Sequence, residues 1–144
     1  MTELLLQCRI AGRPAAFLAC DVQSVIAIEE ITPIPGTPDF ILGLTALRSQ
    51  ALTVIDCARA IGMEYSGSAD EMRAAVVEID GHPYAFLVDA AYDVGDALGE
   101  PIAVPGGFGG DWQRVARGLV ETENGPTLLL DTSALIAAPR QEAA

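Results

Sequence analysis

The chain has no lysine, and arginine supplies all eight of its basic residues. Twenty acidic residues oppose them and leave a formal net charge of −12. Phosphate backbones and anionic membrane surfaces repel a protein of such charge, so the composition argues against a nucleic-acid partner. It favours another protein as the partner.

Long apolar runs and paired cysteines are also missing. No stretch approaches the roughly 18 apolar residues of a membrane span, and the N-terminus lacks the positive start of a signal peptide, so we expect a cytoplasmic protein without membrane insertion. Cys8, Cys20 and Cys57 form no Cys-x-x-Cys pair, which leaves no sign of a zinc or redox site. A turn at Ala11-Gly12 places residue 8 opposite residue 15, so a Cys8–Cys20 disulfide is not expected. We expect no metal and no cofactor.

What the chain does contain is an internal repeat. Residues 10–18 recur sixty-nine positions later as residues 79–87, and six of the nine are identical. A second echo, at an offset of seventy-five, relates Asp56 to Asp131. Such self-similarity predicts two related modules of roughly sixty to seventy residues. Because a lone module of this size buries little apolar surface, the two should share a core.

Short apolar runs separated by turn residues predict five strands and one helical turn in each half. The predicted strands cover residues 4–10, 13–19, 22–31, 41–48 and 51–55 in the first half, and 73–79, 83–88, 92–98, 115–121 and 127–130 in the second. Asp80-Gly81 is a favoured two-residue hairpin turn, and a further turn is expected at Ser49-Gln50. Asp56 and Asp131 each follow a strand, and we expect them to cap helical turns at residues 57–61 and 132–137.

An all-β chain of short strands closes most simply into barrels, because closure removes exposed strand edges. We therefore predict two five-stranded β-barrels in tandem within a single domain, residues 1–144. The first barrel is mainly residues 4–61, the linker 62–72 and the second barrel mainly 73–137. An exchange of terminal segments between residues 1–63 and 112–144 is an alternative.

Residues that could carry chemistry have simpler interpretations. Asp56 and Asp131 could act as paired carboxylates, but their place before a helical turn favours N-capping. His82 is the single histidine and lies beside a hairpin turn, with no serine or cysteine partner indicated by spacing. We therefore expect no enzymatic activity.

Two further features stand out. Residues 106–110 are glycine-rich but lack the lysine, serine or threonine of a phosphate-binding loop, which predicts a flexible loop held to the body by Phe108 or Trp112. Arg48 lies between two strands of a strongly acidic chain. It is equally open to a surface salt bridge, worth less than about 1 kcal/mol, and to a contact with a partner, since arginine is enriched at interfaces.

Several fragments in a fixed order resemble a known family. Residues 38–49, PDFILGLTALRS, are similar to the signature P-x-x-I-x-G-x-x-N-L-R-G of the CheW family of bacterial chemotaxis coupling proteins. Val54-Ile55-Asp56 resembles the V-I-D that follows it, and Leu129-Leu130-Asp131 the terminal L-L-D. The strand around Val22 resembles V-x-E-[VI], and Val88-Asp89 with Asp93-Val94 resembles V-D-x-x-x-D-V.

The resemblance implies two SH3-like five-stranded barrels, the CheW-like fold, and a non-enzymatic adaptor. Proteins of the family join the cytoplasmic tip of a chemoreceptor to the regulatory domain of the histidine kinase CheA, in arrays at the membrane. The receptor-facing residues of the family map onto Arg48, Leu47, Val22 and Ser24.

The chain departs from the family pattern at three places: Ala46 replaces Asn, Ser49 replaces Gly and Ser24 replaces Glu. A divergent adaptor is the leading hypothesis. One alternative is a decoy that binds a single partner and blocks the array. Another is an enzyme or small-ligand domain that uses Asp56, Asp131 and His82 in a cleft between the barrels.

Overall fold

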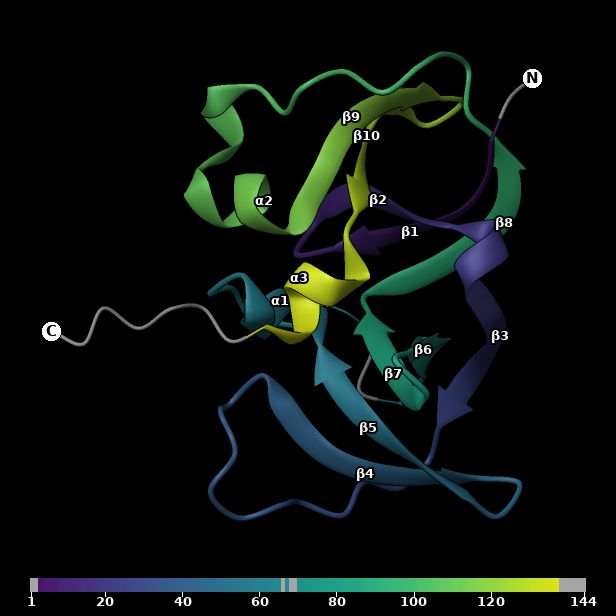
Figure 1. Cartoon of the computed structure of the whole chain (residues 1–144), viewed down its shortest axis with the longest axis vertical. Coiled ribbons are helices and arrows are strands. Elements are labelled where there is room, and N and C mark those ends of the chain that lie inside the picture. Colours follow the sequence, from purple (N-terminus) through teal and green to yellow (C-terminus); the bar gives the residue numbers. More distant parts are fainter. Residues whose placement is uncertain (1–2, 66, 68–69, 138–144) are drawn as a thin grey trace, which may run out of the picture.

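Ten strands form two five-stranded sheets in the computed structural model, which describes residues 3–65, 67 and 70–137 (Figure 1). Sheet A has the order β8-β1-β2-β10-β9 and comprises β1 (Leu4–Ile10), β2 (Arg13–Leu18), β8 (Ala90–Asp96), β9 (Ala116–Thr122) and β10 (Gly125–Leu130). Sheet B has the order β3-β6-β7-β5-β4 and comprises β3 (Val22–Ile28), β4 (Ile41–Leu47), β5 (Gln50–Asp56), β6 (Met72–Ile79) and β7 (His82–Val88). The predicted all-β fold is confirmed.

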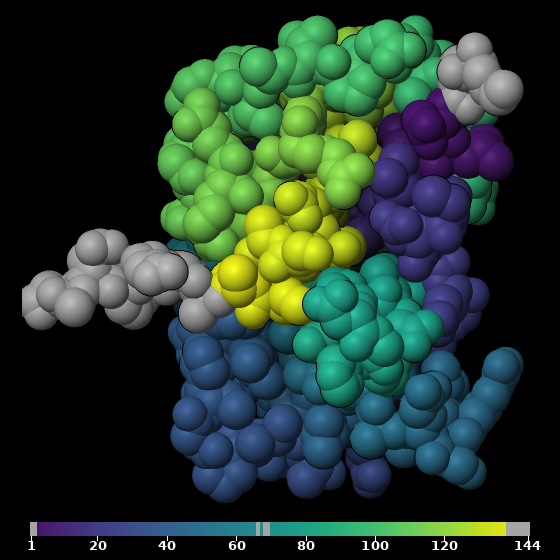
Figure 2. Space-filling model, viewed as in Figure 1, coloured from purple at the N-terminus to yellow at the C-terminus, as the bar shows by residue number. Residues whose placement is uncertain are grey.

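Short helices connect the strands. They are η1 (Ala19–Asp21), α1 (Cys57–Ala60), η2 (Gly106–Phe108), α2 (Gly110–Val115) and α3 (Thr132–Ile136). In Figure 1 sheet A lies above and sheet B below, with α1 and α3 between them. The space-filling view in Figure 2 shows the yellow segment that includes α3 lying across this junction, between the green segment above and the teal and blue segments below.

The two repeats exchange their first hairpins reciprocally. The offsets of the repeat make β6, β7 and β8 the counterparts of β1, β2 and β3, and β9 and β10 the counterparts of β4 and β5. Each sheet therefore contains the first two strands of one repeat and the last three strands of the other. Parallel pairing completes each sheet, between β2 and β10 and between β5 and β7.

The expected assignment of the strands of residues 4–61 to one barrel and those of 73–137 to the other is thus wrong. The exchanged elements are the hairpins β1–β2 and β6–β7, and β2 of residues 1–63 pairs with β10 of residues 112–144. Turn residues specify a hairpin locally, but the strand that completes the sheet lies far away in the sequence. Burial of the apolar faces selects that strand.

The two hairpin turns have matching geometry. Ala11 and Gly12 have φ values of 52° and 81°, and Asp80 and Gly81 have 52° and 83°. Positive φ at both central residues is the geometry that two-residue hairpins prefer. Cys8 pairs with Ala15 as expected, and the three cysteines are free.

Among the described residues, three apolar clusters hold the fold together. The largest lies between the sheets and includes Phe17, Phe40, Phe86, Trp112 and Leu135. One smaller cluster is formed mainly by buried side chains of sheet A, and another by buried side chains of sheet B. The shared core is therefore confirmed, and burial of each large apolar side chain in it stabilises the fold by roughly 1.5–3 kcal/mol.

Some local predictions need correction. The turn between β4 and β5 lies at Arg48-Ser49 and not at Ser49-Gln50, because Leu47 pairs with Gln50. β3 ends at Ile28, before the two glutamates and the proline-rich loop. The expected glycine-rich loop forms η2 and begins α2.

Aromatic anchoring explains how the glycine-rich segment becomes helical. Trp112 is buried in the core between the sheets, and the ring of Phe108 lies 4.9 Å from the guanidinium carbon of Arg13. The predicted linker, residues 62–72, includes residues 66, 68 and 69, which lie outside the described part of the chain.

Candidate functional site

The four predicted partner-binding residues lie on the two edge strands of sheet B or next to them. Val22 and Ser24 lie on β3 and pair with Val77 and Val76 of β6. Leu47 ends β4, and Arg48 follows it in the hairpin turn. Ser24 and Arg48 are exposed, whereas Val22 and Leu47 are half-buried against apolar clusters.

A groove of about 370 Å³ runs between these edge strands. Its lining residues are Ile26, Ala27, Glu29, Glu30, Thr32, Leu44, Thr45, Ala46 and Leu47. Two backbone hydrogen bonds of 2.8 Å between Thr32 and Leu44 tie the two sides together. The groove thus brings Leu47 together with the second half of β3. Val22 and Ser24 are not among its lining residues.

Arg48 stands at the tip of the β4–β5 hairpin in a left-handed conformation. Its φ is 52° and that of Ser49 is 70°, a region that disfavours residues other than glycine. Among the described residues, no carboxylate forms an ion pair with Arg48; the recorded pairs use Arg59, Arg73 and Arg114. The guanidinium is therefore exposed beside the groove, and no described carboxylate forms with it the surface salt bridge that the sequence left open.

Sequence reasoning missed the residues that shape the groove. Leu44 is 37% exposed and its neighbour Thr45 only 8%, the reverse of the order that hydrophobicity predicts. Glu29 and Glu30 were assigned to the interior of a strand but follow its end as exposed carboxylates at the groove. A charged pair directly before a proline-rich loop is the signal that could have indicated them.

A second, more polar hollow of about 680 Å³ lies at one end of sheet A. Its lining comprises Gln7, Cys8, Arg9, Pro14, Ala15, residues 92–96, Glu123, Asn124 and Thr127. The polar groups there bond to one another: the Asn124 side chain donates to Gln7, and the hydroxyls of Thr122 and Thr127 are 2.9 Å apart.

The residues considered for catalysis do not converge. Asp56 accepts hydrogen bonds from the backbone N–H groups of Ala58 and Arg59, and Asp131 accepts one from Ala134. Both are thus helix N-caps, as predicted. His82 is exposed at the start of β7, and neither hollow is lined by any of the three residues.

Burial suppresses the reactivity of the two core cysteines. Desolvation, with a contribution from Asp89, raises the pKa of the Cys8 thiol far above its ordinary value. Desolvation raises the pKa of Cys57 as well, with Cys8, Asp56 and Asp89 adding to it. Both thiols therefore stay protonated at neutral pH, and a protonated thiol is a poor nucleophile.

Within the described ranges, no three His, Cys, Asp or Glu side chains are placed to hold a metal ion. None of the helices in this part of the chain is long and apolar enough to cross a membrane.

Comparisons with known proteins agree with this architecture. The model of the CheW-like domain matches residues 4–140. The chemotaxis protein CheW of Rhizobium meliloti is 25% identical over 128 residues, which cover 84% of this chain and 83% of that protein. A probable chemotaxis protein CheW of Rhizobium etli is 28% identical over 128 residues, covering 86% and 83%.

The crystal structure of the scaffolding protein TtCheW from Thermoanaerobacter tengcongensis matches with a TM-score of 0.80 and 25% identity, covering 91% of this chain and 85% of that one. Because the family model spans nearly the whole chain, the chain belongs to the CheW-like domain family, the non-enzymatic scaffolding adaptors of chemotaxis signalling.

Proposed function

We propose that this adaptor couples the cytoplasmic tip of a chemoreceptor to the regulatory domain of a CheA-type histidine kinase, and that Arg48, Leu47, Val22 and Ser24 contact the receptor. Membership of the family supports the coupling role. The observation that carries the assignment of the surface is Arg48: its side chain is exposed beside the groove, and among the described residues no carboxylate forms an ion pair with it.

The chemistry of this surface suits a helical partner. Ile26, Leu44 and Leu47 offer apolar surface, and an amphipathic helix can lay its apolar face into such a groove. Glu29 and Glu30 at the groove favour basic groups on the partner, whereas Arg48 favours an acidic one. A helix with both signs of charge beside an apolar stripe satisfies all three features.

Charge reversal at Arg48 tests the proposal. Arg48→Glu should weaken binding to a receptor cytoplasmic fragment by about 1–3 kcal/mol, because it removes a charge-assisted contact and adds a repulsive charge. Binding to the kinase regulatory domain should be unchanged. Calorimetric titrations against each partner measure both effects, and the melting temperature reports folding.

Arg117→Glu is the matched control, because Arg117 is exposed on β9 of the other sheet. It should leave receptor affinity unchanged. If Arg48→Glu folds and binds the receptor as tightly as the wild type, the receptor surface assigned here is wrong. The substitutions at Ala46, Ser49 and Ser24 would then favour a decoy that binds the kinase alone.

A further inference from the structure

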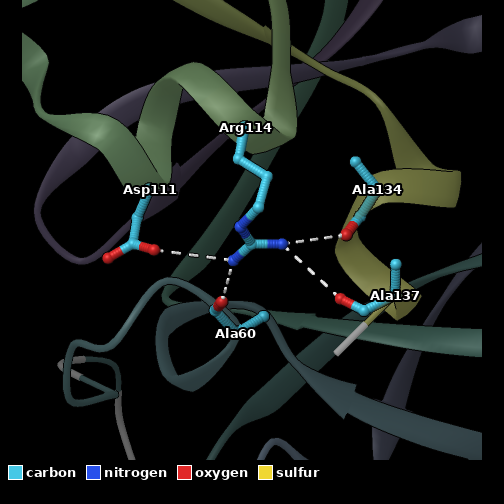
Figure 3. Close-up of polar contacts among 5 residues, drawn as sticks. All are labelled: Ala60, Asp111, Arg114, Ala134 and Ala137. Carbon is cyan, nitrogen blue, oxygen red and sulfur yellow. Dashed lines mark hydrogen bonds and ion pairs between the residues drawn. The ribbon is translucent and has the colours of Figure 1, made fainter. Parts of the chain in front are cut away.

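Arg114 joins three helices by its side chain (Figure 3). From α2 its guanidinium donates to the backbone oxygen of Ala60 at 2.7 Å and to that of Ala134 at 3.2 Å, with a longer contact of 3.5 Å to Ala137. Asp111, one turn earlier on α2, lies 3.7 Å away and forms an ion pair with it. One side chain thus reaches backbone oxygens separated by more than seventy residues.

These acceptors belong to the ends of two helices. Ala60 is the last residue of α1, and Ala134 and Ala137 lie in the last turn of α3 and just after it. Carbonyl groups at a helix C-terminus lack partners within the helix and carry the negative end of its dipole. A planar guanidinium with several donors can satisfy two such ends together, whereas a lysine ammonium acts as a point charge.

The connected helices belong to different sheets. α1 directly follows β5 of sheet B, whereas α3 directly follows β10 of sheet A and α2 leads into β9 of the same sheet. The hydrogen bond to Ala60 is therefore a link from sheet A to sheet B. Arg114 is 28% exposed, so the link lies at the margin of the joint core, where water competes less than at an open surface.

Directional bonds at this place add a constraint to that of the core between the sheets. The cluster between the sheets is apolar, and apolar attraction has no preferred direction. Hydrogen bonds have length and angle requirements, so three carbonyl contacts restrict how α1 can shift against α2 and α3. The contacts of Arg114 with Ala60, Ala134 and Ala137 form what we call the Arg114 clamp. Trp112, on the same short helix, is buried in the joint core and anchors α2 there.

We propose that Arg114 is a positioning residue that fixes the orientation of sheet A relative to sheet B, so that the adaptor holds its two partners in one geometry. The part about partners rests on the proposed function, whereas the part about orientation does not. If the two sheets could reorient, the adaptor would still bind each partner, but it would not hold the two partners in a fixed geometry relative to each other.

The first experiment measures orientation in the free protein. Residual dipolar couplings of backbone amides are fitted separately for sheet A and sheet B. The wild type and Asp111→Asn, which keeps the carbonyl contacts, should each give one common alignment tensor. Arg114→Met, which keeps the aliphatic stem and removes the donors, should give two different tensors. A common tensor in a folded Arg114→Met protein would overturn the proposal.

The second experiment measures coupling. Arg114→Met should bind the receptor fragment and the kinase domain separately within about twofold of the wild-type affinities, but lose at least tenfold in the affinity of the kinase for the adaptor–receptor complex. Asp111→Asn should behave like the wild type. Unchanged assembly in Arg114→Met would contradict the role in coupling. If the wild-type protein bound neither partner, the proposed function would be wrong. The dipolar couplings would still test whether Arg114 fixes the orientation of the two sheets.

Arg114→Lys covers the case in which the methionine variant does not fold. A single ammonium cannot bond Ala60 and Ala134 in the bidentate way of a guanidinium. The folded Arg114→Lys protein should therefore show separate alignment tensors for the two sheets. Wild-type couplings in Arg114→Lys would mean that charge alone is sufficient, and the clamp as proposed would be wrong.

Discussion

The two capping aspartates, Asp56 and Asp131, hold equivalent places in the repeat but differ in environment. Asp56 is only 3% exposed, whereas Asp131 is half-buried. Burial raises the pKa of Asp56, and it outweighs the lowering effects of the two N–H donors and of Arg59; nearby Asp89 adds to the rise. Burial of this cap thus moves the pKa of Asp56 above its ordinary value.

This shift predicts how stability varies with pH. Because the folded pKa of Asp56 is above 3.8, the folded state favours the protonated form, and the contribution of Asp56 is greatest below that value. It should decline as pH rises through the folded pKa. Asp56→Asn keeps an acceptor oxygen but does not titrate. The free energy of unfolding of the wild type minus that of Asp56→Asn should therefore decrease between about pH 3 and neutrality.

Urea titrations at a series of pH values measure this difference. Asp131→Asn is the matched control, because it changes the equivalent and more accessible cap. A difference for Asp56→Asn that stays flat or increases with pH would contradict the assignment of burial as the dominant cause.

At the scale of elements, one glycine determines the edge of the groove. Gly43 lies in β4 with a φ of 143°, at a shift in the register of its pairing with β5. A Cβ at this position would overlap the carbonyl oxygen of Thr32 and lie 2.7 Å from its carbonyl carbon. The glycine therefore permits the close approach that lets Thr32 and Leu44 exchange two hydrogen bonds.

Gly43→Ala should destabilise the protein by more than about 2 kcal/mol, because the clash involves rigid backbone and the φ is unfavourable for alanine. Gly99→Ala is the matched control, since a Cβ there meets nothing within 4 Å, and it should change stability by less than about 0.5 kcal/mol. Chemical unfolding of both variants is the measurement. Equal stability of Gly43→Ala and the wild type would show that β4 can move away from Thr32 at little cost.

At the scale of the whole molecule, the reciprocal hairpin exchange makes the two repeats depend on each other. Neither sheet can form from one half, because each takes its strands from both sides of residues 65–70. Parallel pairs join β2 to β10 and β5 to β7. The duplication seen in the sequence therefore does not correspond to two folding units.

Fragments 1–65 and 70–144 should each lack a cooperative unfolding transition when alone, because each loses the strands that complete its sheets. Mixed in equal amounts, they should recover the circular dichroism of the intact chain. Urea unfolding followed by circular dichroism tests both statements. A cooperative transition in either isolated fragment would show that one repeat can form a closed sheet by itself.

By itself the sequence determined the features that depend on neighbouring residues. Asp80-Gly81 predicts its hairpin turn, and Asp56 and Asp131 predict their helix caps, because turns and caps involve residues two to four positions apart. Alternation of apolar runs and turns predicts an all-β chain, and the motif around Arg48 indicates the family. The repeat predicts the equivalence of β1–β5 and β6–β10, and the structure bears this out.

Only the tertiary structure decided how distant elements combine. The exchange of hairpins depends on parallel pairing across more than thirty residues for β5 and β7 and more than one hundred for β2 and β10, and local signals carry no information about such pairs. Leu44 and Thr45 lie on opposite faces of β4, and the tertiary structure buries the face that carries Thr45. The clamp at Arg114 exists because the fold brings the ends of α1 and α3 within reach of one guanidinium. Packing between segments far apart in the sequence, and not the preferences of any single segment, places these groups together.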